Sequence, residues 1–129
     1  MTSSEPIPPV LHELEALVMD ELWRQAPVTV RDVMDVLNQS AEKPRAYTTY
    51  MTILARLHRK GLLDRWRKGK TDLYAPRLSR EQYAEARAGG EIAALVQQYG
   101  DVALAHFARH IATLDPERQK RLRRLARRA

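Results

Sequence analysis

Several side chains that could form hydrogen bonds with a polyanion lie in one short stretch, residues 47–61, with the sequence YTTYMTILARLHRKG. Thr49, Thr52, Arg56 and Arg59 recur at helical spacing, so they are expected on one side of a helix. Hydroxyl and guanidinium groups are side chains that contact base edges and phosphates in the major groove of DNA. The stretch alone favours two interpretations equally, a helix that contacts DNA and a surface helix with a solvated basic face.

The opposite side of this stretch is apolar, so the predicted helix can dock on a protein core. Its apolar residues are Tyr50, Ile53, Leu54 and Leu57. Gly61 stands where the C-cap of such a helix is expected, because glycine tolerates the left-handed backbone that ends many helices. The remaining elements must therefore supply the core and position this helix.

Charge is segregated along the 129-residue chain, whose formal net charge is +6. Residues 43–77 carry a net charge of +8, whereas residues 1–42 carry −6. Residues 78–116 carry −2, and the tail from residue 117 carries +6. Basic residues concentrated in one internal block are typical of a surface that binds a polyanion.

The segment before the basic block predicts an arm and two helices. Residues 1–9 contain three prolines and two serines and predict a flexible arm. A helix is expected over residues 10–25, ended by Pro27, with the one-sided apolar residues Leu14, Leu17, Val18 and Leu22. Residues 28–30 could pair as a minimal strand. Thr29 and Asp32 then form a capping box for a second helix, whose inward residues are Val33, Met34 and Leu37.

The segment after Gly61 predicts a basic β-hairpin. Residues 62–67 and 71–76 are the two expected strands, and Lys68, Gly69 and Lys70 are the turn between them. Helix, short strand, helix, helix and hairpin is the order of a winged helix-turn-helix, predicted here over residues 10–77. In that fold the third helix enters the major groove while the hairpin contacts the flanking backbone. The candidate DNA-contacting residues are Tyr47, Thr49, Thr52, Arg56, Arg59, Arg65, Arg67, Lys68 and Lys70.

Residues 78–129 predict short amphipathic helices. A capping box of Ser79 and Gln82 opens the first, Gly89 and Gly90 are expected to weaken or interrupt it, and Asp115 caps the last. These helices have too few apolar residues for an independent core, which favours dimerisation over intramolecular folding. The predicted dimer-interface residues are Ile92, Leu95, Val96, Tyr99, Leu104, Phe107, Ile111, Leu122 and Leu125.

The segments LHELEALVMDELW, VTVRDVMDVL, AYTTYMTILARLHRKGLLDR, LYAP and SREQY resemble the BlaI/MecI/CopY family of bacterial penicillinase repressors. The similarity runs from about Pro8 to Leu125. It implies a mainly α protein, a homodimeric repressor with an N-terminal winged-helix DNA-binding domain and a C-terminal helical dimerisation domain. It also implies that Thr48, Thr49 and Thr52 lie at the groove end of the recognition helix.

Two features depart from the family pattern. The copper-responsive branch carries a C-terminal cysteine pair motif, and this chain has no cysteine, which excludes copper sensing by that route. In staphylococcal members a sensor-linked protease cuts an Asn-Phe step, and here the matching step is His106-Phe107. The resemblance thus implies a protease partner, although the cleaved step differs. The family's best-known targets are β-lactamase and other β-lactam-resistance genes.

Other classes of function have weaker support in the sequence. No nucleophile–histidine arrangement, acid pair or phosphate-binding glycine loop is present, so we expect no enzyme and no cofactor. His106 and His110 are spaced for a shared metal, but packing roles fit them better, so no metal is expected. With no secretion signal or membrane span, a cytoplasmic protein is expected. A basic RNA-binding or architectural protein without sequence preference remains the alternative.

Overall fold

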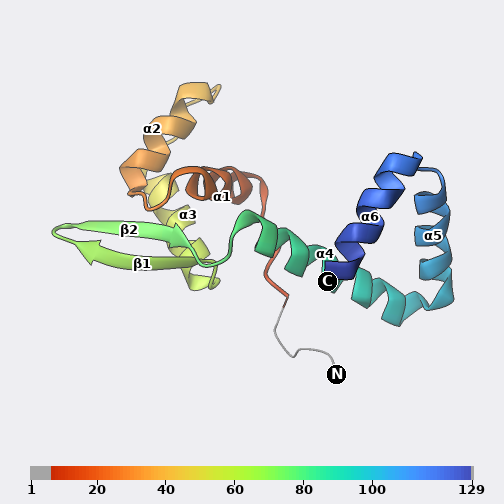
Figure 1. The fold of residues 1–129 in the computed structure, drawn as a ribbon. Coiled ribbons are helices and arrows are strands. Elements are labelled where there is room, and N and C mark those ends of the chain that lie inside the picture. Colours follow the sequence, from red (N-terminus) through yellow and green to blue (C-terminus); the bar gives the residue numbers. More distant parts are fainter. Residues whose placement is uncertain (1–6, 129) are drawn as a thin grey trace. The chain divides into compact units, whose positions relative to one another are not determined.

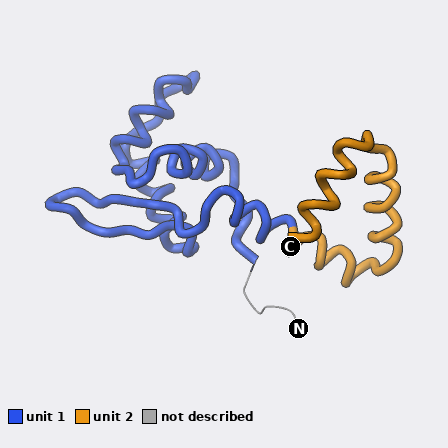
Figure 2. Tube along the Cα trace, viewed as in Figure 1, with its two compact units in different colours: residues 1–88 blue, residues 89–129 orange. Residues whose placement is uncertain are grey.

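The computed structural model describes residues 7–128, so most of the expected arm, residues 1–6, lies outside the described residues. The chain divides into two compact units, residues 1–88 (unit 1) and residues 89–129 (unit 2) (Figure 2). The division falls within a helix, whereas the sequence placed a boundary between residues 77 and 78. No helix of the described part is long and apolar enough to cross a membrane.

Unit 1 contains three helices, a two-stranded antiparallel sheet and the first part of a fourth helix (Figure 1). The order of these elements is that of a winged helix-turn-helix, as predicted. Their bounds are α1 Glu13–Gln25, α2 Val30–Ser40, α3 Tyr47–Arg59, β1 Leu63–Lys68, β2 Thr71–Pro76 and α4 Arg80–Tyr99.

The core of unit 1 lies where α1, α2 and α3 meet the base of the hairpin. α3 contributes its four predicted apolar residues, and all of them are buried. α1 differs from its prediction, because Leu17 is 43% exposed and Met19 is buried instead. The buried cluster comprises Val18, Met19, Leu22, Val28, Val30, Val33, Tyr50, Ile53, Leu54, Leu57, Leu62, Leu63 and Tyr74.

Local sequence signals set most of the boundaries in unit 1. The backbone N–H of Asp32 donates to the Thr29 hydroxyl at 3.1 Å, and the Thr29 N–H donates to the Asp32 carboxylate at 2.9 Å. This is the predicted capping box of α2. The first helix starts at Glu13 rather than Val10, and only Val28 of residues 28–30 pairs, as a single bridge to Tyr74.

The hairpin formed by β1 and β2 is the wing. Leu63 pairs with Pro76 at its base and Lys68 pairs with Thr71 at its tip. Because side chains alternate along a strand, Arg65 shares a face with its partner Tyr74, and Trp66 lies on the other face. Trp66 is 42% exposed, whereas Trp23 on α1 is half-buried.

Unit 2 consists of the end of α4 together with α5 (Asp101–Ala112) and α6 (Pro116–Arg128). α4 runs continuously through Gly89 and Gly90, which corrects the predicted interruption. Gly100 separates α4 from α5 with φ of +59°, a value that side chains disfavour. The N–H of Arg118 donates to the Asp115 carboxylate at 2.9 Å, so the predicted cap of α6 is present.

Candidate nucleic-acid interface

The exposed side of α3 carries the hydroxyl and guanidinium groups that the sequence singled out. Thr48, Thr52, Arg56 and Arg59 are exposed, and Thr49 is half-buried. At 3.6 residues per turn, Thr48, Thr52 and Arg59 follow one another along the middle of this exposed side. The first two turns therefore present short hydroxyls, and the longer cationic side chains follow towards the C-terminus.

Asn38 fixes the chain where it enters α3. Its amide nitrogen donates to the carbonyl of Arg45 at 2.9 Å, and its amide oxygen accepts the Arg45 N–H at 3.0 Å. The same oxygen accepts the hydroxyl of Tyr50 at 2.7 Å. One side chain of α2 thus ties the connecting loop to the first turn of α3, which limits how far that turn can shift.

The other end of α3 is held by its cap and by an ion pair between half-buried Lys60 and a buried carboxylate. The N–H groups of Gly61 and Leu62 donate to the carbonyls of His58 and Leu57, both at 3.0 Å, in a Schellman arrangement that uses the +84° φ of Gly61. Lys60 Nζ lies 2.8 Å from Glu15 Oε2 on α1. α3 is therefore anchored at both ends.

Glu15 is 1% exposed, so its charge needs compensation. Burial raises the pKa of this carboxyl, but the hydrogen bonds from Lys60 and from the His12 backbone N–H lower it, and the net pKa lies below the ordinary value. The His12 N–H donates to Glu15 Oε1 at 3.1 Å, which also caps α1. Glu15 is ionised at neutral pH and holds Lys60 in place.

The wing is joined to the helical body through Tyr74. Its N–H donates to the Val28 carbonyl at 2.8 Å, and its carbonyl accepts the Val28 N–H at 3.0 Å. Arg65 lies over the Tyr74 ring at 5.7 Å and forms an ion pair of 2.8 Å with Asp72. The hydrogen bond to Asp72 raises the pKa of Arg65, and burial raises the pKa of Tyr74. Arg65 is thus engaged within the wing.

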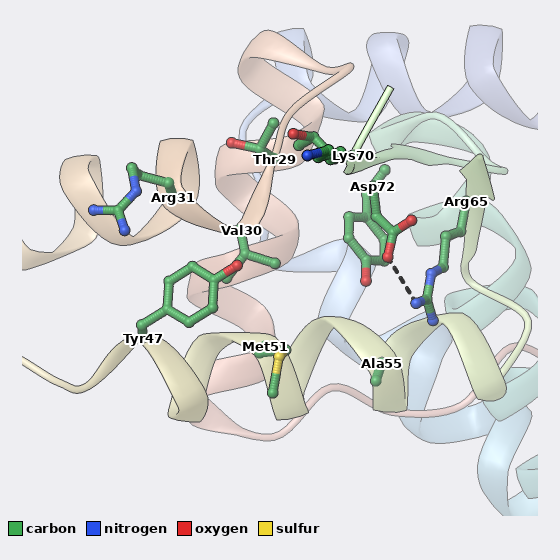
Figure 3. Close-up of a pocket in the computed structure, with 11 residues that line it drawn as sticks. Thr29, Val30, Arg31, Tyr47, Met51, Ala55, Arg65, Lys70 and Asp72 are labelled. Carbon is green, nitrogen blue, oxygen red and sulfur yellow. Dashed lines mark hydrogen bonds and ion pairs between the residues drawn. The ribbon is translucent and has the colours of Figure 1, made fainter. Parts of the chain in front are cut away.

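A cleft of about 420 Å³ separates α3 from the wing (Figure 3). Tyr47, Met51 and Ala55 line it from α3, while Arg65, Lys70 and Asp72 line it from the wing. The N-terminus of α2, together with Thr71 and Tyr74 of the wing, forms the rest of its wall. The wing side holds two cations and one carboxylate, so the positive charge there is partly neutralised.

The structure brings the predicted residues together on α3 and the wing, but they differ in exposure and in their contacts with other side chains. Lys68 and Lys70 are exposed at the wing tip, and the guanidinium of Arg67 donates to the Lys70 carbonyl at 3.3 Å. Tyr47 is 41% exposed, and the Arg31 guanidinium lies 5.6 Å from its ring centre. Arg65, paired with Asp72, is the least available of the predicted cations to an incoming phosphate.

The sequence missed three residues at this surface. Arg31 lies at the second position of α2, Met51 is 44% exposed in the cleft, and Asp72 holds Arg65. Arg31 had a detectable signal, since an exposed cation in the first turn of α2 is unfavourable for the helix dipole and suggests another purpose. The contact between Asp72 and Arg65 depends on the strand register, which the sequence did not give.

The two histidines spaced for a shared metal, His106 and His110, both lie on α5. No group of three or more histidine, cysteine, aspartate or glutamate residues lies close enough to hold a metal within residues 7–128. His106 instead lines an apolar hollow of about 220 Å³ in unit 2, together with Leu95, Tyr99 and Phe107.

The predicted interface residues of unit 2 are largely uncovered in the single chain. Ala103 is the one buried residue among residues 89–128. Val96, Phe107 and Leu122 are half-buried. The exposed members are Ile92, Leu95, Tyr99, Leu104, Ile111 and Leu125, and Val102, which the sequence analysis omitted, is 64% exposed.

Residues 11–128 match the family model described as penicillinase repressor. The chain belongs to this family. It is 37% identical over 116 residues to the transcriptional regulator BlaI of Mycobacterium tuberculosis, a match that covers 86% of this chain and 80% of the relative. It is 26% identical over 80 residues to the penicillinase repressor of Bacillus licheniformis, covering 61% of this chain and 60% of that protein.

A solved structure of the Bacillus licheniformis BlaI monomer in complex with the blaP half-operator is 25% identical, with a TM-score of 0.49. The match covers 59% of this chain and 90% of that one. Membership of the repressor family confirms the resemblance found in the sequence. As a member of this family, the protein is a sequence-specific DNA-binding transcriptional regulator and not an enzyme.

Proposed function

We propose that the protein acts as a homodimer that represses transcription by occupying a dyad-symmetric operator. The observation that carries the proposal is the exposed side of α3, where Thr48, Thr52 and Arg56 project beside a cationic wing. Thr48, Thr49 and Thr52 contact base edges from the first turns of α3, and Arg56 and Arg59 contact bases or phosphates further along. Arg67, Lys68 and Lys70 of the wing contact the flanking backbone, a role that needs charge but no base preference.

The dimer is formed by unit 2, whose apolar side chains have little to cover them within one chain. Leu95, Tyr99 and Phe107 line an apolar hollow, and Leu104 and Ile111 are more than two-fifths exposed on α5. Burying such side chains against a second copy removes apolar surface from water and gives a closed two-fold assembly. The two copies of α3 in the dimer then bind half-sites whose centres are separated by about 34 to 36 Å or a multiple of that distance.

Occupancy is the mechanism of repression. While the dimer covers the operator, transcription from the adjacent promoter is blocked. Much of the binding free energy comes from neutralised phosphates, so the affinity falls steeply as salt rises. The protein works where the DNA lies, which in a bacterial cell is the cytoplasm.

We propose β-lactamase or related resistance genes as the regulated targets, because the family's relatives are penicillinase repressors. A sensor-linked protease is the proposed release partner. The step that it would cut, His106-Phe107, lies inside α5, where Phe107 is half-buried. Proteases bind extended chain, so cleavage there requires α5 to open locally first.

The affinities of the wild-type dimer for operator and scrambled duplex, measured at matched salt, test the proposal. Thr52→Ala should lower the affinity for operator alone by about 1 to 3 kcal/mol. Lys70→Ala should lower both affinities alike and reduce the salt slope by about 1. Equal wild-type affinities for both duplexes, or unchanged discrimination in Thr52→Ala, would contradict the proposed contact surface.

A further inference from the structure

α6 is the most cationic element of the described chain. Its 13 residues include seven basic side chains and one acidic one, Glu117. All seven basic side chains are exposed. They are Arg118, Lys120, Arg121, Arg123, Arg124, Arg127 and Arg128.

The cations are gathered on one side of α6. At about 100° per residue, six of the seven fall within an arc of about 160°, and Arg118 lies outside it. Leu122, Leu125 and Ala126 lie on the opposite side. The two sides are therefore available for different partners, and an apolar contact with a second copy would leave the cationic side, residues 120, 121, 123, 124, 127 and 128, in water.

This arrangement is not explained by the stability of the helix. Lys120 and Arg124, Arg123 and Arg127, and Arg124 and Arg128 are like-charge pairs at i, i+4, which destabilise a helix by a few tenths of a kcal/mol each. No ion pair to any of the seven occurs among the described residues. The helix dipole favours cations in the last turn only. The repulsion is relieved when a polyanion binds.

We propose that the cationic side of α6 is a second DNA-binding surface, which contacts the phosphate backbone without sequence preference. It rests on the DNA-binding function of the family but is separate from α3 and the wing. Six cations along a helix of about 20 Å give one positive charge per about 3 Å, comparable to the dense negative charge of duplex DNA. Each chain then binds DNA through one specific surface and one purely electrostatic surface.

The apolar side of α6 argues against an anionic membrane as the partner. Helices that lie in a membrane interface insert tryptophan, phenylalanine and several leucines. α6 has no aromatic residue, and its apolar side consists of two leucines and one alanine. Charge complementarity without apolar insertion fits a phosphate backbone. Binding of α6 to anionic vesicles in place of DNA would contradict the proposal, so vesicle binding is measured as well.

The first experiment compares a neutral and a charged triple substitution on the cationic side. Arg123→Gln/Arg124→Gln/Arg127→Gln removes three charges, whereas Arg123→Lys/Arg124→Lys/Arg127→Lys keeps them and serves as the matched control. The glutamine variant should lower the slope of log affinity against log salt by about 2.7 per chain, and the lysine variant should keep the wild-type slope. The ratio of affinities for operator and scrambled duplex should stay unchanged in both.

Three results of this experiment overturn the proposal. One is a glutamine variant with the wild-type salt slope. Another is a glutamine variant that loses binding to vesicles of anionic phospholipid but keeps its affinity for DNA. A lysine variant that loses the slope together with the glutamine variant also counts against it, because shape rather than charge would then matter.

A second measurement needs no variant, so it stands even if the glutamine protein misfolds. Lys120 is the single lysine in residues 89–129. Its acetylation rate, followed by mass spectrometry, should fall several-fold when a scrambled duplex is added at low salt. Lys60, held by Glu15, is an internal reference whose rate should change little.

The same measurement separates this inference from the proposed contact surface. Protection of Lys68 and Lys70 at the wing tip without protection of Lys120 would overturn the role of α6 and leave the wing in place. Protection of Lys120 alone would support α6 and contradict the wing contact. Discrimination between operator and scrambled duplex tests α3 and does not depend on either lysine set.

Discussion

Units 1 and 2 are both helical, but they bury their apolar residues to very different extents. Unit 1 places 13 hydrophobic residues in one buried cluster. In unit 2, Ala103 alone is buried among residues 89–128, although the helices there carry clear apolar stripes. A polypeptide whose apolar side chains stay in water gains little stability from folding. The small apolar area that it buries does not offset the loss of chain entropy.

The difference separates the part that is proposed to contact bases from the part that is proposed to dimerise. Unit 1 can position α3 and the wing within one chain, because the contacts that anchor both ends of α3 all lie inside unit 1. Under the proposed dimerisation, unit 2 gains its stability from the surface of a second copy. The fold of unit 1 should therefore be independent of protein concentration, and that of unit 2 should depend on it.

The largest expected effect comes from a charge placed in the apolar stripe of unit 2. Phe107→Glu puts a carboxylate into the hollow that Leu95 and Tyr99 line, so the dimer should dissociate. Losing the second half-site contact should lower operator affinity by roughly 100-fold to 10,000-fold. Sedimentation equilibrium and operator binding measure both results.

Ala105→Glu is the matched control for this prediction. It adds the same charge to α5 on the exposed side opposite Ala103. The control should remain dimeric and keep its affinity. A Phe107→Glu protein that sediments as a dimer would show that unit 2 is stabilised in another way.

The next prediction compares one leucine from each unit. Leu54→Ala removes a fully buried side chain from unit 1 and should lower its free energy of unfolding by about 2 to 5 kcal/mol, at any protein concentration. Leu104→Ala, at a side chain that is 49% exposed, should act through the dimer equilibrium instead. Denaturant unfolding at two protein concentrations tests this contrast, which fails if both variants show the same concentration dependence.

Local signals allowed most of the fold to be predicted from the sequence. The capping boxes at Thr29 and Ser79, the glycine cap at Gly61 and the apolar side of α3 each depend on residues a few positions apart. Gly89 and Gly90 were misjudged, because the cost of glycine in a helix is only about 1 kcal/mol each and longer-range packing can offset it. The same limit applies to Leu17, whose exposure depends on where α1 docks.

The candidate site was predicted in its residue types but not in its contacts. The sequence identified Thr52 and Arg56 from their spacing, and the family resemblance added Thr48. It could not give the pairing of Glu15 with Lys60 or of Arg65 with Asp72, because these depend on tertiary packing and strand register. Arg65 therefore looked as available as Lys70, whereas in the folded protein it is held by a carboxylate.

The ion pair of Glu15 predicts a pH dependence in unit 1. The pKa of this carboxyl is lower in the folded protein than in the unfolded chain, so its stabilisation is present above the unfolded pKa and is lost as pH falls through the folded pKa. Glu15→Gln should therefore lower the free energy of unfolding at neutral pH by about 1 to 3 kcal/mol. The gap to wild type should begin to narrow as pH falls below about 4.3, the ordinary glutamate pKa, and should close as pH falls through the lower folded pKa.

Glu13→Gln is the control for this pH effect, because Glu13 lies on the same helix but is exposed. Its unfolding profile should follow that of the wild type within about 0.5 kcal/mol. Denaturant unfolding of both variants between about pH 3 and pH 7 gives the comparison. A Glu15→Gln profile parallel to wild type across this range would mean that Lys60 does not hold a buried charge.

The smallest expected effect concerns the wing, the part of unit 1 that most resembles unit 2 in its exposure. Trp66 lies opposite Leu73 on the outer face of the hairpin, away from the buried Tyr74. Trp66→Ala should change the free energy of unfolding by no more than about 0.5 kcal/mol. Trp23→Ala should cost more, because that ring is half-buried and its Nε1 donates to the Leu78 carbonyl at 2.9 Å. Equal losses in the two variants would mean that the outer face of the wing is covered in solution. The wing would then resemble unit 2, whose exposed apolar residues are proposed to need a partner, rather than the rest of unit 1, which buries its apolar residues within one chain.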